Sequence, residues 1–135
     1  MSHADERDGE ILRRLINIDN KTDSMGDSLA WLVQANAPHL KTELVKAFGN
    51  SRRRVQVYLL LNGSRNVDDI ANLLQMKGQN VSIELTWLRR KRLIHIVEAG
   101  RGGKKYRKKF FDAVIGLSDE LMTKFELDAH GKSAR

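Results

Sequence analysis

The spacing of apolar residues changes after Arg92, and this change limits the folds that the chain can adopt. Up to that point apolar residues recur every three or four positions, as they do on one face of a helix. The next segment, Leu93 to Glu98 (LIHIVE), predicts a strand, and Lys105 to Phe110 (KYRKKF) predicts a return strand after the glycine-rich turn AGRGGK. We therefore expect a mainly α fold with one small β-hairpin.

Helix signals lie on both sides of this hairpin. Asn66 is a suitable cap for a short helix through Leu74, because Asp68 and Asp69 follow it in the first turn, where carboxylates interact favourably with the helix dipole. Gly78 permits a sharp reversal before the next helix. The predicted helices cover about residues 8–36, 37–48, 51–61, 67–74, 80–92 and 112–127, the last one notched at Gly116 and recapped by Ser118.

The first of these helices carries a heptad pattern. Its apolar stripe follows the a/d spacing and consists of Ile11, Leu15, Ile18, Thr22, Met25, Leu29 and Leu32. A single long stripe needs a partner surface, which is either a second copy of the chain or the last helix of the same chain. We favour the dimer because the stripe is long. Gly26 leaves open a break in this helix.

Composition excludes several classes of function. The chain has no cysteine, which excludes disulfides, thiolate metal sites and cysteine nucleophiles. Its four histidines are scattered and its acidic residues form no evident catalytic pair, so we expect no metal, no cofactor and no enzymatic activity. No stretch approaches the roughly 20 apolar residues that span a bilayer, and the acidic start does not resemble a secretion signal. We expect a cytoplasmic protein without a membrane partner.

Positive charge is concentrated in residues 51–110. The whole chain carries a net charge of +7, but this segment holds 15 of the 24 Lys and Arg residues and only 4 of the 17 Asp and Glu residues. Its own net charge is therefore +11, and the remainder carries −4. A cationic segment of this size is typical of proteins that bind nucleic acid.

The segment NVDDIANLLQMKGQNVSIELTWLRRKRLIHI, residues 66–96, resembles winged helix-turn-helix regulators of the ArsR and MarR type. In that pattern a polar residue and Val-Ser open the recognition helix, and leucines follow at the third and sixth positions after the serine. The residues that match are Asn80, Val81, Ser82, Leu85 and Leu88. The resemblance covers about residues 51–110 and implies sequence-specific binding of double-stranded DNA by a dimeric transcription regulator.

The resemblance and the heptad stripe together predict an organisation of the chain. Residues 51–110 form the winged helix-turn-helix, residues 1–50 an N-terminal helical arm for dimerisation, and residues 111–135 a C-terminal helix for dimerisation or packing. Two alternatives remain open. One is a winged-helix module that binds other proteins, and the other is an architectural or non-specific nucleic-acid-binding protein.

Eleven residues are candidate DNA contacts. Those expected to face the major groove are Gln79, Asn80, Ser82, Ile83 and Thr86, because Val81, Leu85 and Leu88 turn inward. Phosphate contacts are expected from the later helix turns and the hairpin, at Arg89, Arg90, Arg101, Lys104, Lys105 and Arg107.

Two positions of the recognition helix differ from the pattern. Ile83 and Glu84 stand where such regulators often carry a polar donor. Ile83 could meet a thymine methyl group, and Glu84 could accept a hydrogen bond from a cytosine amino group. Trp87 is expected to anchor the core or an interface rather than to stack on a base.

Overall fold

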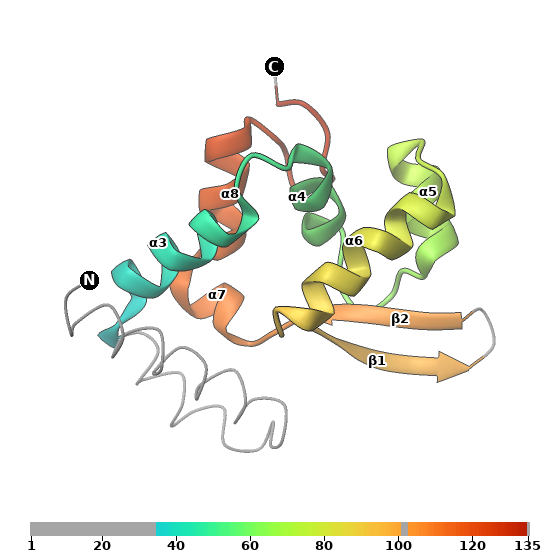
Figure 1. The fold of residues 1–135 in the computed structure, drawn as a ribbon, viewed down its shortest axis with the longest axis horizontal. Helices are drawn as coiled ribbons and strands as arrows, with labels where there is room; N and C mark the ends of the chain where they lie inside the picture. Colours follow the sequence, from blue (N-terminus) through green and yellow to red (C-terminus); the bar gives the residue numbers. More distant parts are fainter. Residues whose placement is uncertain (1–34, 101–102, 135) are drawn as a thin grey trace.

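The computed structural model describes residues 35–100 and 103–134, which form a mainly helical fold with one two-stranded antiparallel sheet (Figure 1). The elements in chain order are α3 (Ala37–Phe48), α4 (Arg52–Leu59), α5 (Val67–Leu74), α6 (Gly78–Arg90), β1 (Ile94–Gly100), β2 (Gly103–Lys108), α7 (Phe111–Ile115) and α8 (Leu117–Phe125). The expected mainly α class with a small hairpin is confirmed. The heptad helix and Arg101 lie outside the described residues, apart from residues 35 and 36.

The helix boundaries follow local signals in the sequence. The Asn66 side chain accepts a hydrogen bond from the Asp69 backbone N–H at 2.8 Å, and the Asp69 carboxylate accepts one from the Asn66 N–H at 3.0 Å. This reciprocal capping box satisfies two backbone donors at the start of α5. Gly49 ends α3 with a φ of +60°, a conformation that glycine adopts without strain.

The last predicted helix is divided at Gly116, as expected. Gly116 has a φ of +72° and separates α7 from α8. The prediction that Ser118 caps the second helix was wrong, because Ser118 lies inside α8 and its hydroxyl donates to the Asp112 carboxylate at 2.8 Å. The buried Tyr58 hydroxyl donates to the same Asp112 oxygen at 2.6 Å, so this carboxylate links α4, α7 and α8.

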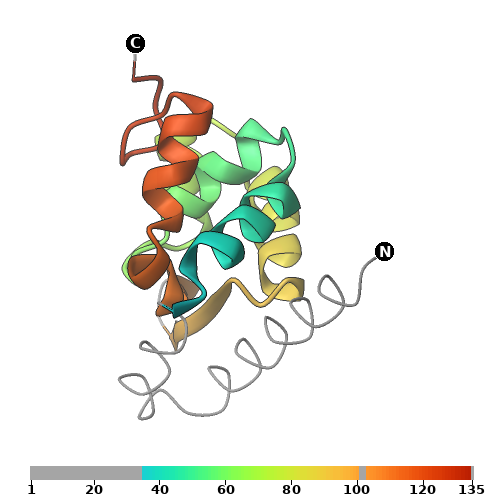
Figure 2. The same ribbon diagram turned by 90° about the vertical axis from the view of Figure 1, so that its left-hand side faces the viewer.

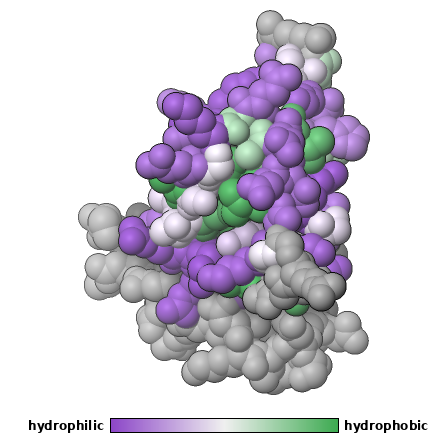
Figure 3. Space-filling view, turned by 90° about the vertical axis from the view of Figure 1, so that its right-hand side faces the viewer, coloured by the Kyte–Doolittle hydropathy of each residue, from purple (hydrophilic) through white to green (hydrophobic). Residues whose placement is uncertain are grey.

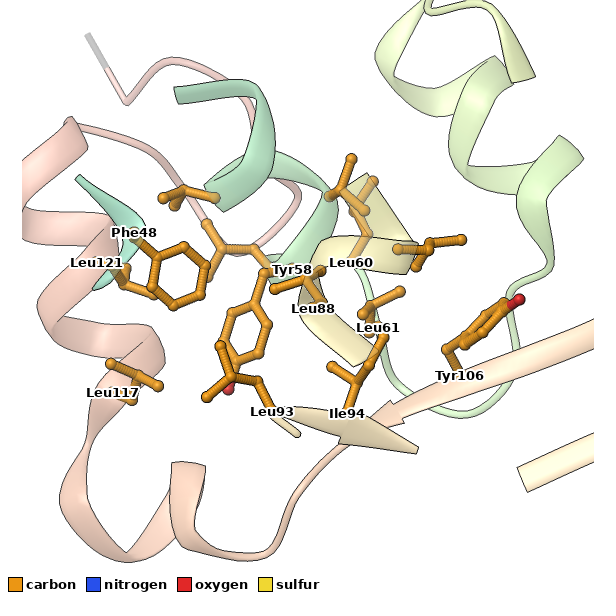
Figure 4. Packing of buried hydrophobic residues seen from close by; sticks show 14 of the residues in the cluster. Phe48, Tyr58, Leu60, Leu61, Leu88, Leu93, Ile94, Tyr106, Leu117 and Leu121 are labelled. Atoms are coloured by element: carbon orange, nitrogen blue, oxygen red, sulfur yellow. The ribbon is translucent and has the colours of Figure 1, made fainter. Parts of the chain in front are cut away.

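The core lies where four helices meet. Phe48 of α3, Tyr58 of α4, Leu88 of α6 and Leu117 of α8 are all at most 1% exposed, and Figure 4 shows the cluster around Tyr58. The Phe48 ring packs edge-on against Tyr58 at 5.2 Å between ring centres and also contacts Trp87 at 5.6 Å. Helices α3 and α8 lie side by side on one side of this core (Figure 2). Helix α6 is therefore held in place by the helices that pack against its buried face.

The hairpin is tied to the helical body at its base. β1 and β2 pair from Ile94 with Lys108 to Gly100 with Gly103, with a register shift between Ile96 and Glu98. An isolated antiparallel bridge joins Asn62, before α5, to Arg107 on β2. The Gly63 N–H donates to the Tyr106 carbonyl at 2.8 Å. The hairpin therefore has a defined position relative to α5 and α6.

The strands are displaced from the predicted ranges. The sequence pattern ends the first strand at Glu98 and begins the second at Lys105, whereas the structure continues pairing to Gly100 and Gly103. At the other end, Phe110 and Phe111 leave the sheet and begin α7, so the second strand ends at Lys108.

Candidate nucleic-acid interface

α6 has two faces of different character. Val81, Leu85 and Leu88 are at most 2% exposed and point into the core, as predicted. The opposite face carries an exposed stripe, which we call the α6 stripe. It consists of Gln79, Ser82, Ile83, Thr86 and Arg90. All five are candidate DNA contacts from the sequence, and the structure brings them together on one continuous face.

The other candidates differ in exposure. Arg89, Lys104 and Arg107 are exposed, and Asn80 and Lys105 are half-buried. Asn80 therefore offers less of its side chain to a partner than the residues of the α6 stripe do.

Thr86 is exposed, but its hydroxyl group is engaged within the helix. The hydroxyl donates to the Ser82 carbonyl one turn earlier, at 2.9 Å. Because its proton is used there, Thr86 presents its methyl group and its oxygen lone pairs, and no free hydroxyl donor.

Glu84 does not belong to the exposed face. Its side chain is buried, and one carboxylate oxygen accepts a hydrogen bond from Arg54 Nε at 2.8 Å. The prediction that Glu84 could accept from a cytosine amino group was wrong. Its place three residues after Val81 turns it toward α4, where the Arg54 guanidinium compensates its charge.

Trp87 lies beside this ion pair. The indole is half-buried against the core, and the guanidinium carbon of Arg54 lies 3.9 Å from its ring centre. Arg54 is thus held by a carboxylate and by an aromatic face together. The expectation that Trp87 anchors the core is confirmed.

Two lysines of the hairpin region turn inward. Lys108 Nζ donates to the Leu59 carbonyl at 3.0 Å, and Lys109 is only 2% exposed. Burial lowers the pKa of Lys108, although the nearby Asp112 carboxylate acts in the opposite direction. The sequence positions of these two lysines suggest exposed charge on the hairpin, but neither side chain adds to it. The sequence does indicate the inward turn of Lys108, because Lys108 stands two residues after the inward Tyr106 and so shares its face of the strand.

The exposed charge of α6 itself is of one sign. Glu84 is the single acidic residue in the sequence between Lys77 and Val97, and its charge is compensated by Arg54. The last turn of α6 carries Arg89 and Arg90, and Lys104 and Arg107 follow on β2. These exposed cations favour an anionic partner.

Apolar groups interrupt the hydrophilic surface. Figure 3 views the molecule from the hairpin side and shows a hydrophobic area surrounded by hydrophilic side chains. Among the described residues, the large apolar side chains exposed most are Leu73 on α5, Ile83 on α6 and Val97 on β1. Of these three, Ile83 alone belongs to the α6 stripe.

Two further features are absent from the described residues. Residues 35–100 and 103–134 hold no group of three or more His, Asp or Glu side chains placed to bind a metal ion. No helix within the same ranges has the length and apolar character needed to cross a membrane. Comparison of the chain with protein-family models, curated proteins and solved structures finds no match.

Proposed function

We propose that this protein binds double-stranded DNA through a winged helix-turn-helix formed by α4 to β2. In this proposal α6 is the recognition helix and enters the major groove. The β1–β2 hairpin is the wing and contacts the backbone or the minor groove. The observation that carries the proposal is the exposed α6 stripe, which ends in Arg90 beside a cationic hairpin fixed to the same body.

The arrangement of α5 and α6 supports this assignment. The two helices contact each other and are separated only by Gln75, Met76 and Lys77, which matches the short turn of a helix-turn-helix. Gln75 adopts a left-handed conformation with a φ of +54°, which reverses the chain within that turn. Ala71 is buried, and its small side chain allows α5 to lie close to its neighbours.

The dimensions and charges also suit a duplex. A helix with its side chains is about 10–12 Å across, and the major groove of B-DNA is about 12 Å wide. In that groove Gln79 and Ser82 can form hydrogen bonds with base edges, while Arg89 and Arg90 reach phosphates. Lys104 and Arg107 then extend the phosphate contacts along the hairpin.

We propose that the protein performs this function as a dimeric transcription regulator. Two copies related by a twofold axis would place their α6 helices about one DNA turn, roughly 34 Å, apart on a pseudo-palindromic site. The heptad segment that we expect to join the copies lies outside the described residues. Sedimentation of the free protein and of its DNA complex tests this part of the proposal, because two chains per duplex are expected.

The salt dependence of duplex affinity tests the function itself. We expect the double variant Lys104→Ala with Arg107→Ala to bind all duplex sequences more weakly. Its slope of log affinity against log salt should fall by about 0.9 for each phosphate that the variant no longer neutralises. The matched control is Lys46→Ala with Lys124→Ala, which removes the same charge from α3 and α8. Equal effects of the two double variants would contradict a binding surface on the hairpin.

A further inference from the structure

Ile83 occupies the middle of the α6 stripe and is 56% exposed. A single exposed apolar residue is ordinary on a protein surface. The position of this one is informative, because Gln79 lies one turn before it and Thr86 lies almost one turn after it on the same face. Any partner that reads the stripe must accommodate an apolar group at its centre.

The side chains around Ile83 limit which base pairs the stripe can recognise. No Lys or Arg lies within α6 before Arg89, so its first three turns hold no cation to pair with guanine O6 and N7. The one acid, Glu84, is turned toward Arg54 and cannot accept from cytosine. The Thr86 hydroxyl donates to its own helix. The first three turns of α6, which surround Ile83, therefore lack the groups that recognise a G·C pair best.

Thymine is the base that offers an apolar group in the major groove. Its C5-methyl group projects there, and apolar side chains contact it directly. The amide of Gln79 has the geometry to bind the N6 and N7 of adenine. An apolar centre with an amide one turn away thus fits A·T pairs in both orientations.

From this arrangement we propose that Ile83 reads thymine by contact with its C5-methyl group, so that thymine lies at the centre of the DNA segment bound by each α6 helix. This inference rests on the proposed DNA binding and names the base class that it selects. A carbonyl such as thymine O4 has no part in the contact, because Ile83 has no hydrogen-bonding group in its side chain.

Deoxyuridine tests the contact, since it lacks only the methyl group and keeps the base pairing of thymine. Duplexes that bind would first be selected from random DNA, and each thymine would then be replaced singly by deoxyuridine. We expect affinity to fall about fourfold at one or two positions, the value for removing one buried methyl-sized group. 5-Methylcytosine placed at the same position should bind about fourfold more tightly than cytosine, because it restores the methyl group.

The variant Ile83→Ala assigns the effect to this residue. Its affinity should no longer change when deoxyuridine replaces the sensitive thymine. Leu73→Ala is the matched control, because it removes an exposed apolar side chain from α5 and should keep the full sensitivity of the original protein. Both positions are exposed, and thermal unfolding would verify that both variants fold.

Three results would overturn the inference, and they separate it from the proposed function. Duplex binding without sensitivity to deoxyuridine at any position rejects the methyl contact and leaves DNA binding intact. Equal sensitivity of Ile83→Ala and the original protein rejects Ile83 as the reader. Failure to bind any duplex rejects the proposed function together with the inference.

Discussion

Arg54 on α4 donates through Nε to the Glu84 carboxylate on α6 at 2.8 Å, and its guanidinium carbon lies 3.9 Å from the centre of the Trp87 ring. The Arg54 side chain is 21% exposed and that of Glu84 9%. This contact and the buried Val81, Leu85 and Leu88 together fix the rotation of α6 about its own axis. The contact also keeps the single acid of α6 away from the exposed stripe, where its charge would repel phosphate.

A double-mutant cycle on Arg54 and Glu84 should show strong coupling. Glu84→Ala leaves a partly buried arginine without its carboxylate, so we expect the free energy of unfolding to fall by about 1–3 kcal/mol. The double variant should lose less than the sum of the single variants, with a coupling energy of about 1 kcal/mol or more. Urea denaturation of the four proteins measures this coupling.

The chain offers a surface pair as the control for that cycle. Lys46 and Glu43 lie 3.7 Å apart on α3, with side chains 69% and 43% exposed. Because solvent screens this pair, its coupling energy should stay below about 0.5 kcal/mol. Similar coupling for the two pairs would mean that Arg54 and Glu84 do not hold α6 in place.

Tyr58 should make the stability of the protein sensitive to alkaline pH. Burial, and then the charge and hydrogen bond of Asp112, raise the pKa of Tyr58 well above its usual value of 10.0. The folded protein therefore retains this proton where the unfolded chain has released it. Stability from this group is fully present below about pH 10 and is lost as pH rises from there through the raised pKa.

The variant Tyr58→Phe tests this effect. At pH 7 it should be less stable by about 1–2 kcal/mol, because a buried hydrogen bond to a charged group is absent from it. Above about pH 10 its stability should fall less steeply than that of the original protein. The lowered pKa of Lys108 works in the opposite direction, but Lys108 is present in both proteins. Parallel stability curves across this alkaline range would refute the role given to Tyr58.

The C-terminal segment should be sensitive to a methyl group at Gly131. The Gln56 amide donates to the Gly131 carbonyl at 2.9 Å, which holds this segment against α4. Gly131 has a φ of +72°, and an added Cβ would lie 3.1 Å from the Gln56 carbonyl oxygen. Gly131→Ala should therefore lower stability by more than the roughly 1–2 kcal/mol of a left-handed backbone alone.

Gly116→Ala is the matched control for Gly131→Ala. Gly116 has the same φ of +72°, but nothing lies within 4 Å of an added Cβ. It should show the backbone cost without the close contact, so the difference between the two variants measures the packing of the C-terminal segment. Equal shifts in the urea midpoint would argue against that packing.

Much of the fold could be predicted because it depends on local signals. The capping residue Asn66, the left-handed Gly116 and the inward leucines of α6 act within a few positions of the chain. The period of two in residues 93–98 predicted the hairpin, although the pairing of Gly100 with Gly103 extends it. These features needed no knowledge of distant contacts.

The remaining features of the site depend on contacts distant in sequence. The sequence pattern leaves Glu84 available to a base, because its partner Arg54 is 30 residues away on another helix. The strand alternation indicates that Lys108 turns inward with Tyr106, but it does not identify the acceptor, the Leu59 carbonyl on α4. A polar side chain can be buried only where such a partner exists, and the sequence pattern does not identify that partner.

The exposed face of α6 and the hairpin should together contact one duplex. NMR titration of the labelled protein with a selected duplex tests it most directly, by locating the backbone amides whose shifts change. We expect changes along α6 from Gln79 to Arg90 and along β2 from Gly103 to Lys108, with little change in α3 and α8. Changes confined to α3 and α8, or no changes at all, would contradict it.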